Sequence, residues 1–214
     1  MLRGGRWIPG CALMVSLWCA RDAQAGEFKP EIRLGARAVA EMWQEPALAR
    51  IYRSSRFAGA GTAGFWFDVG LPVAFGVEAD MTWHRMTGSA VSLSTDHSGS
   101  HATTLELLPA AFRACVRYPV GEAEIFGGLG PAVTSYQETA PMADISGNKV
   151  GLAMEAGIRF DTHFVDPPME YPPRTVKRID AEVFAGRRQH QLFDIGTGLD
   201  LSAWRVGAGL AARF

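Results

Sequence analysis

Three of the five histidines lie near one another in the sequence, beside serines that could support nucleophilic chemistry. His84, His97 and His101 lie in or beside the serine-rich segment 87–100. A histidine that is held by a carboxylate can take a proton from a serine hydroxyl, as acyl-transfer enzymes require. Asp80 and His84 are four residues apart, so on a strand they share a face and could form such a His–carboxylate pair. Serine-rich loops are nevertheless ordinary loop composition, and an inward histidine is readily satisfied by carboxylates, so we expect no catalytic site.

The sequence predicts no metal or cofactor site. The histidines are scattered, and Cys115 stands alone in the expected mature chain, whereas a structural zinc site needs four ligands. The glycine-rich stretch 127–130 falls inside a predicted strand instead of between a strand and a helix, so it is not a phosphate-binding loop. A single mature cysteine also excludes an intramolecular disulfide.

Charged and small residues alternate with apolar residues in several segments. In the clearest segment, 73–84, the apolar side chains of one face are Val73, Phe75, Val77, Ala79, Met81 and Trp83, and the other face carries Ala74, Gly76, Glu78, Asp80, Thr82 and His84. Successive side chains of a strand point to opposite faces. A transmembrane barrel turns the apolar face to lipid and keeps charged and small residues inside, so this pattern is typical of its strands.

Eight alternating segments are separated by turn residues. They cover 29–42, 60–71, 73–84, 101–118, 122–136, 149–161, about 178–189, and 200–214. They predict an all-β fold, an eight-stranded antiparallel up-and-down transmembrane β-barrel. The fourth segment alternates less regularly. There we favour an outer face of Leu108, Ala110, Phe112, Ala114 and Val116, with Arg113, Cys115 and Arg117 inward.

The connections between these segments predict how the barrel sits in the membrane. The joins 43–59, 87–100 and 137–148 are long and polar, whereas those after the second and fourth segments are tight turns. Small outer-membrane barrels have short periplasmic turns and longer external loops, so we expect the three long joins to be extracellular. The segment 162–177 is long yet falls on the periplasmic side, and its prolines suggest a stiff, extended excursion.

The N-terminus has the pattern of a secretory signal. Residues 1–25 begin with Arg3 and Arg6, continue with a short apolar stretch and end in Ala-Gln-Ala, a small-residue cleavage pattern. We therefore expect a signal peptide over 1–25 and one barrel domain over 26–214. Cleavage would remove three arginines and one aspartate, so the net charge would change from −1 to −3, which argues against nucleic-acid binding. The apolar stretch is shorter than the about 20 residues that a membrane-spanning helix needs.

The inward positions of the predicted strands carry many charges. An eight-stranded barrel is just wide enough for its own side chains to fill it, and buried charges must be paired and hydrogen-bonded. We therefore predict interlocking arginine–carboxylate pairs that close the lumen, in preference to a water-filled conduit. The candidate lumen network consists of Arg33, Arg37, Glu41, Asp68, Glu78, Asp80, His84, Arg113, Glu124, Glu155, Arg159, Glu182 and Arg205.

The last segment ends in an aromatic residue. Counting back from Phe214, Leu210 and Val206 continue one apolar face. With the eight alternating segments, the signal pattern and the tight turns, this strand resembles those of the small eight-stranded outer-membrane β-barrel family, of the OmpA-barrel and OmpX type. The resemblance implies localisation in the outer membrane of a Gram-negative bacterium. It also implies that Val206, Leu210 and Phe214 form the signal that the barrel-assembly machinery reads.

From these observations we expect an integral outer-membrane protein with a structural or surface-interaction role, and no enzymatic activity. Its expected partners are outer-membrane lipids and lipopolysaccharide, with the external loops as the binding region for an extracellular ligand, and it needs no cofactor. Some barrels of this size modify lipid A, so one alternative is a deacylase or acyltransferase that depends on His84. A narrow solute pore is a second alternative. A soluble lipocalin-like barrel would need its apolar face inward and leaves Phe214 unexplained.

Overall fold

The computed structural model describes residues 29–52, 55–91, 100–140, 143–162, 176, 178–190 and 200–214. The predicted signal peptide over 1–25, His97 with most of its serine-rich segment, and most of the segment 162–177 lie outside the described residues. Within the described residues, the chain consists almost entirely of β-strands and includes one short helix.

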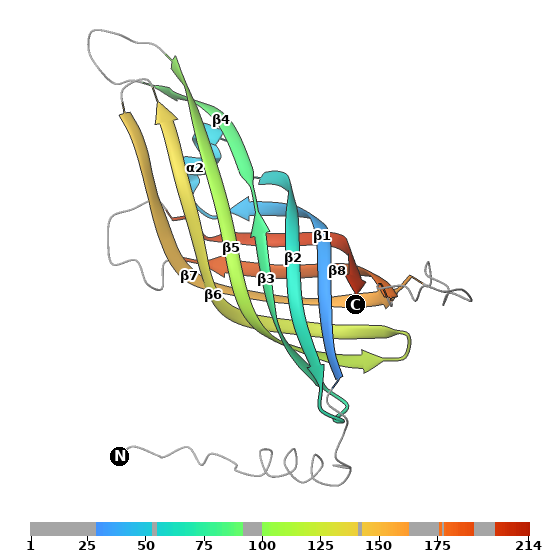
Figure 1. Ribbon diagram of the computed structural model, residues 1–214. Helices are drawn as coiled ribbons and strands as arrows, with labels where there is room; N and C mark the ends of the chain where they lie inside the picture. Colours follow the sequence, from blue (N-terminus) through green and yellow to red (C-terminus); the bar gives the residue numbers. More distant parts are fainter. Residues whose placement is uncertain are drawn as a thin grey trace, which may run out of the picture.

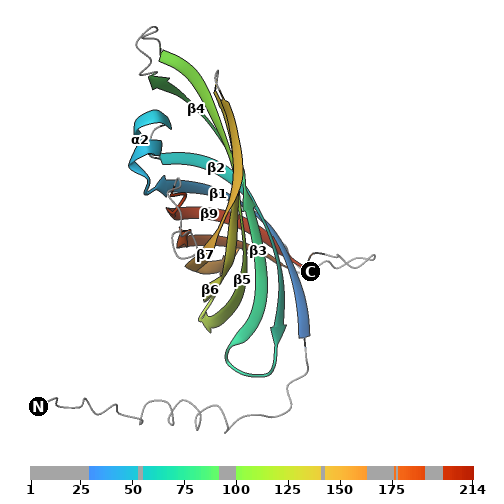
Figure 2. The ribbon, with the colours of Figure 1, turned by 90° about the vertical axis from the view of Figure 1, so that its left-hand side faces the viewer.

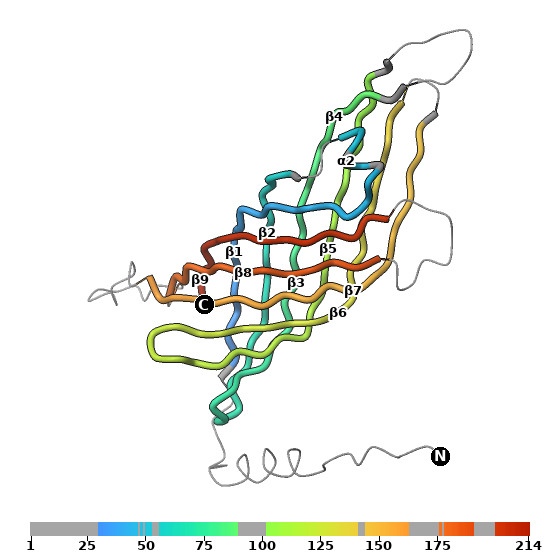
Figure 3. Tube along the Cα trace, turned by 180° about the vertical axis from the view of Figure 1, so that it is seen from behind, coloured from blue at the N-terminus to red at the C-terminus, as the bar shows by residue number. Residues whose placement is uncertain are grey.

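The strands form one antiparallel sheet that closes on itself (Figure 1). In the described residues they are β1 (Lys29–Trp43), β2 (Ser55–Asp68), β3 (Ala74–Thr82), β4 (His84–Val91), β5 (Ser100–Val120), β6 (Ala123–Ala140), β7 (Ala143–Asp161), β8 (Arg178–Gln189) and β9 (Ala203–Arg213). The first strand pairs with the last, and β3 pairs with both β2 and β5. The tube seen from behind in Figure 3 shows β1 and β9 side by side at this closure.

β3 and β4 are two parts of one strand path. Both pair with β5 in a single register, in which Met81 lies opposite Ala110 and His84 lies opposite Leu107. The interruption between them falls where Pro109 of β5 should pair, and proline has no N–H to donate to the ladder. Counted as paths through the barrel, the sheet therefore has eight strands, and the predicted eight-stranded antiparallel up-and-down barrel is confirmed.

The two faces of the wall differ as the alternation predicts. Outward side chains such as Leu34, Leu129 and Val150 are about half exposed, although they are large and apolar. In β5 the favoured register is correct, because Phe112 lies on the outer face and Arg113 is buried. An apolar outer band around a polar interior is the arrangement of transmembrane β-barrels of the small outer-membrane type.

A short helix, α2 (Pro46–Tyr52), lies within the join 43–59, which the sequence predicted as a polar loop. Figure 2 shows α2 beside β4 at one mouth of the barrel. Its first residue is proline, whose missing N–H costs nothing at that position. Among the described residues, no helix is long and apolar enough to cross a membrane. The mouth that α2 covers is called the capped end below.

The prediction of a loop over 137–148 is also wrong. β6 and β7 extend into this segment and pair with each other as far as Ala140 and Ala143. β4 likewise runs to Val91, inside the expected loop 87–100. β7 pairs with β8 only from Leu152 onward, so its first part extends beyond the barrel wall. Residues 144–146 are all exposed, and strands exposed to water on both faces need no apolar alternation.

Two connections at the opposite end of the barrel, β2–β3 and β5–β6, are tight, as predicted; this end is called the turn end below. Only two residues separate β5 from β6, and one of them is Gly121 at φ 62°. Gly70, between β2 and β3, has φ 74°. Both values lie in the left-handed region that glycine adopts without steric cost.

Candidate functional site

Arginines and carboxylates fill the interior of the barrel. In the described part of the chain, eight arginines and eight carboxylates form three groups that follow one another along the axis. The central cluster comprises Arg33, Arg37, Glu78, Arg113, Glu155, Arg159 and Glu182; the cap-side cluster comprises Glu41, Asp80, His84, Arg188 and Arg205; the turn-side cluster comprises Glu31, Arg117, Glu124, Asp180 and Arg213. All of them stand on inward positions of the strands, where the alternation places them.

Arg37 of β1 is the hub of the central cluster. Its guanidinium is fully buried and lies 2.7 Å from Glu78 Oε1 of β3 and 2.8 Å from Glu155 Oε1 of β7. Its Nε donates to Glu182 Oε1 of β8. One side chain therefore links four strands across the lumen by charge-assisted hydrogen bonds, which are stronger than bonds between neutral groups.

The other central arginines share the same carboxylates. Arg159 lies 2.7 Å from Glu78 Oε2 and 3.1 Å from Glu182 Oε2. Arg33 donates to Glu182 Oε2 at 2.9 Å. Each glutamate thus has more than one cationic neighbour, so the cluster is a network in which the loss of one member leaves several others incompletely paired.

The cap-side cluster contains the histidine that the sequence singled out. His84 Nε2 lies 3.1 Å from Glu41 Oε2, not beside Asp80 as the spacing on one strand suggested. Asp80 instead accepts a hydrogen bond from Arg205 Nη1 at 2.9 Å. Arg188 Nη1 lies 3.3 Å from Glu41 Oε1. Asp80 and His84 are four residues apart on one strand path, which is about 13 Å along it, so their side chains are too far apart to pair and His84 meets a residue of another strand instead.

The turn-side cluster is more accessible to water than the other two. Arg117 Nη1 lies 2.8 Å from Glu31 Oε1, and Arg213 Nη2 lies 2.6 Å from Glu124 Oε2. Arg213 also donates to Asp180. At the rim of the barrel, Arg178 pairs with Asp161. The predicted lumen residue Glu124 therefore belongs to this end of the interior.

Aromatic rings and glycines complete the packing around the charges. The guanidinium of Arg159 lies 3.9 Å from the ring centroid of Phe126, and that of Arg37 lies 4.6 Å from the centroid of Phe184. Such cation–π contacts favour a charge that has lost its water. Opposite Arg37, a side chain at Gly209 would place its Cβ 2.7 Å from Arg37 Cγ, so only glycine leaves room for the arginine.

Asp68 does not belong to the lumen network, and its inclusion was wrong. It is exposed at the last position of β2, where its Oδ1 accepts a hydrogen bond from the Gly70 amide at 2.9 Å. The alternation assigns it an inward position, but the strand ends there. A short acidic side chain at that point closes the turn instead of entering the barrel.

Several interior residues were absent from the predicted network. They are Glu31, Arg117, Asp180, Arg188, His190 and Arg213. The signal that could have found most of them was the alternation itself, because Arg188 lies two and four residues after the inward Gly186 and Phe184. His190 lies just beyond β8, and its Nε2 is 2.9 Å from Thr134 Oγ1.

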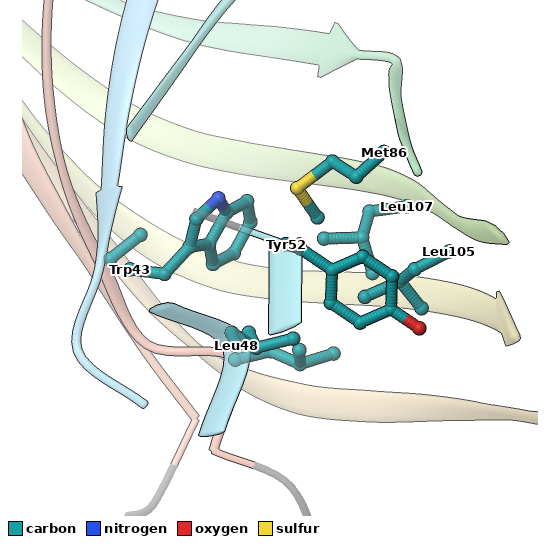
Figure 4. Close-up of a cluster of buried hydrophobic side chains, with 8 residues drawn as sticks. Trp43, Leu48, Tyr52, Met86, Leu105 and Leu107 are labelled. Atoms are coloured by element: carbon teal, nitrogen blue, oxygen red, sulfur yellow. The ribbon is translucent and has the colours of Figure 1, made fainter. Parts of the chain in front are cut away.

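An apolar cap closes the interior next to the cap-side cluster. Six of its side chains are labelled in Figure 4, and the full set is Trp43, Leu48, Tyr52, Met86, Leu105, Leu107, Leu201 and Ala203. The cap combines residues of α2 with the inward positions of the strand ends. Trp43 packs edge-on against the His84 ring at 5.7 Å between centroids, so the cap directly contacts the charged layer.

Tyr52 anchors α2 to the strands. Its hydroxyl donates to Glu138 Oε1 at 2.6 Å and lies 3.0 Å from Thr103 Oγ1. Burial, followed by the hydrogen bond to the Glu138 carboxylate, raises the pKa of Tyr52 to about 12. The neutral phenol is thus the form that the cap stabilises.

The three residues of the predicted assembly signal lie on β9 and directly after it. Val206 and Leu210 are about half exposed on the outer face. The Phe214 amide donates to Ile32 O at 2.9 Å, so the end of the chain is joined to β1.

Within the described residues, no group of three or more His, Cys, Asp or Glu side chains is arranged to hold a metal ion. Cys115 is a buried free thiol on β5. The interior chemistry in the described part of the chain is therefore that of arginine and carboxylate.

No protein-family model matches the chain, and no curated protein matches it. Among solved structures, it is similar to Ail, the attachment invasion locus protein of Yersinia pestis, with 13% identity over 88% of this chain and 100% of that chain and a TM-score of 0.48. It is similar to Neisserial surface protein A, with 9% identity, the same two coverages and a TM-score of 0.47. It is also similar to the N-terminal β-barrel domain of Pseudomonas aeruginosa OprF, with 10% identity over 85% of this chain and 97% of that chain and a TM-score of 0.42. At such identities none of these proteins transfers a role to this chain.

Proposed function

We propose that the chain is an integral outer-membrane protein of a Gram-negative bacterium, with a closed lumen and a structural or surface-interaction role. The observation that carries the proposal is the barrel interior, in which Arg37 alone links three carboxylates from three other strands. Its outer face, in contrast, exposes large apolar side chains that a lipid environment would cover.

The paired interior argues against the pore alternative. A permeating solute would have to separate ion pairs that are buried at the centre of the barrel, and an uncompensated buried charge costs several kcal/mol, on the order of 3–5. The apolar cap adds a second, buried layer, built around Leu48, Leu105 and Leu107. We therefore infer that the lumen conducts neither ions nor solutes.

The capped end is proposed to face outward. Short connections are typical of the periplasmic end of such barrels. The connections β2–β3 and β5–β6 at the turn end leave five and two residues between strands, whereas those at the capped end leave eight or more, apart from the two residues between β6 and β7. This orientation places α2 on the cell surface, together with the ends of β4 to β7 that lie at the capped end. There they can contact lipopolysaccharide, solutes or other cells, which is the proposed binding role.

The proposal assigns no catalytic role to His84. A general base must come within hydrogen-bond reach of its substrate, and His84 is buried next to Trp43 with Glu41 as its partner. The enzymatic alternative makes a distinct prediction. Overproduction would change the acylation pattern of lipid A, and His84→Ala would abolish that change; the closed-barrel proposal expects an unchanged pattern with either protein.

Val206, Leu210 and Phe214 are proposed to act during assembly. They form an apolar row that ends at the last residue, and Phe214 is fixed to β1 at the closure of the barrel. We expect Phe214→Ala to lower the amount of folded protein in the membrane without changing the mobility of the fraction that folds.

Electrophoresis of the membrane fraction with and without boiling tests the proposal. A closed barrel stays folded in cold detergent and migrates differently from the boiled chain. We expect a mobility shift in protein extracted from the outer-membrane fraction. Recovery from the soluble periplasm without a shift would reject the proposed location and the outward direction of the apolar face.

A further inference from the structure

The outer face of the barrel is not uniformly convex. A groove of about 660 Å³ crosses β1, β2, β3, β5 and β6 at the level of the apolar band. Small residues, including Gly61, Ala63 and Ala79, leave the hollow, and larger ones such as Leu34 and Phe112 border it. Its accessible lining is almost wholly apolar.

A second, more polar pocket of about 410 Å³ lies on the same side of the barrel. It brings together the exposed ring of Trp83 and polar side chains of β5, β6 and β7, among them Glu106, Gln137 and Asn148. Ser135 Oγ donates to Asn148 Oδ1 at 2.7 Å, which holds the amide in place. Hydroxyl, amide and carboxylate groups thus surround one edge of an aromatic ring.

The polar pocket continues the apolar groove along the strands. Met81 borders the groove, and the next outward residue of that strand path is Trp83 in the pocket. On β6, Val133 and Ser135 follow in the same way. Two residues of a strand advance by about 7 Å, so the two hollows lie end to end. The polar pocket is the one nearer the capped end.

We propose that the groove and the pocket form one binding site for a membrane glycolipid, with an acyl chain in the groove and a hydroxyl-rich sugar headgroup against Trp83. The site deepens the proposed function and rests on it, since it requires the apolar face to meet lipid and the capped end to face outward. The order of the two hollows matches the order of tail and headgroup in the outer leaflet.

The chemistry of the pocket favours a sugar over a phosphate headgroup. As far as the chain is described, no lysine or arginine lines the pocket, and its charged member is Glu106, which accepts hydrogen bonds from hydroxyls. Arg85, outside the lining, lies 3.5 Å from the Glu106 carboxylate and balances it. Phosphate recognition usually employs arginine or lysine, whereas the flat ring of Trp83 suits the C–H face of a sugar.

Gly61 allows the groove to be filled without disturbing the barrel. A Cβ at Gly61 would meet no atom within 4 Å, so Gly61→Leu projects into the groove alone. Gly127 provides the matched control, because it lies on the outer face between the exposed Ile125 and Leu129, lines neither hollow, and a Cβ there would meet only Glu155 O, at an ordinary contact distance of 3.7 Å. Trp204, exposed on the outer face and stacked with Arg187, is the matched control for Trp83.

The experiment counts the amphiphiles retained by the barrel in native mass spectrometry. The protein is purified in a twelve-carbon amine-oxide detergent and incubated with dodecyl maltoside, with lipopolysaccharide lacking O-antigen, or with a phosphatidylethanolamine. We expect one molecule retained per barrel for the two sugar-bearing probes. Gly61→Leu should weaken retention about tenfold, as expected if about two methylenes of the chain lose contact. Trp83→Ala should weaken retention of the sugar probes roughly fivefold, and Gly127→Leu and Trp204→Ala should leave it unchanged.

Three results would overturn the site: no retained amphiphile, equal effects of the test and control variants, or retention of the phospholipid at the level of the sugar probes. A stable dimer that Gly61→Leu dissociates would assign the groove to a second copy of the chain instead. Boiling-dependent mobility is measured on the same preparation. Absence of the mobility shift rejects the proposed membrane barrel, whereas a shift without retention rejects the glycolipid site alone.

Discussion

The interior of the barrel is packed with ion pairs, whereas its capped mouth is packed with aliphatic and aromatic side chains. Both regions are buried, and the proposed function has both of them close the same lumen. In the interior, each arginine is held by carboxylates on other strands, as Arg37 is by Glu78, Glu155 and Glu182. In the cap, Leu48 and its apolar neighbours make non-directional contacts, and the Tyr52 hydroxyl adds hydrogen bonds at the edge.

The difference indicates how each region should respond to change. Charges in a buried network depend on one another, so removing one leaves its partners unpaired at a high cost. Apolar packing loses free energy in proportion to the contacts removed. We expect α2 to open as a local unit while the barrel stays closed. Substitutions of interior charges should therefore lower the stability of the whole barrel. Substitutions in the cap should lower only the local stability of the cap.

The largest effect is expected for Arg37→Met. It leaves three buried carboxylates without their shared partner, so the free energy of unfolding should fall by about 3–5 kcal/mol. Urea unfolding in lipid vesicles, followed by tryptophan fluorescence, measures this change. If the variant does not fold, Arg37→Met combined with Glu182→Gln should recover folded protein, because one of the unpaired charges is removed. Unchanged stability of Arg37→Met would contradict the network.

A smaller and local effect is expected for Leu48→Ala. The lost contacts should make opening of the cap easier by about 2 kcal/mol. Hydrogen exchange should accelerate in α2, while the urea midpoint of the barrel stays the same. Arg50→Ala, an exposed position on the same helix, is the control and should change neither. A midpoint that falls together with cap protection would show that the two regions are one cooperative unit.

Tyr52→Phe removes one hydroxyl from the cap and should cost about 1 kcal/mol of cap stability. The pKa of Tyr52 is raised from 10.0 to about 12, so its stabilising effect is complete below pH 10 and declines as pH rises from about 10 to about 12. Absorbance of tyrosinate should show a step near pH 12 in the wild type that is missing from Tyr52→Phe. A wild-type titration without that late step would contradict the buried hydrogen bond to Glu138.

The smallest effect is expected at the surface pair of Arg85 and Glu106, whose nearest charged atoms are 3.5 Å apart. Both side chains are substantially exposed, so Arg85→Ala should change the free energy of unfolding by less than about 0.5 kcal/mol, measured by the same urea titration. This variant is the matched control for Arg37→Met, because each removes one arginine from an ion pair. If both variants changed the free energy of unfolding equally, the buried ion pairs of Arg37 would be no more important for stability than the exposed pair of Arg85, and the comparison would fail.

The sequence was sufficient for the barrel wall and much of its interior, because one rule governs both. Alternation assigned Arg33, Arg37 and Arg159 to the interior, and the structure pairs them there. It could not supply the partners, as the placement of His84 beside Glu41 illustrates. Partners come from strands far apart in the sequence, and their meeting depends on the closure and register of the sheet.

Strand alternation could not predict the cap or the extended ends of the strands. α2 has seven residues, too few for a helical period to stand out in a segment read as a polar loop. The ends of β6 and β7 project beyond the part of the sheet that pairs with β8, and most of their side chains are polar or small, so the segment resembles a loop in sequence. Asp68 shows the opposite error, since alternation was extended past the point where its strand ends.

Single-channel recording in a planar bilayer tests the closed lumen most directly. The protein is inserted at neutral pH from a preparation whose mobility shift on boiling shows that it is folded. The account predicts no steady open level for the wild type, because the network around Arg37 and the apolar cap both block the interior. A long-lived, reproducible conductance carried by the wild-type barrel would contradict the closed lumen and favour a narrow pore.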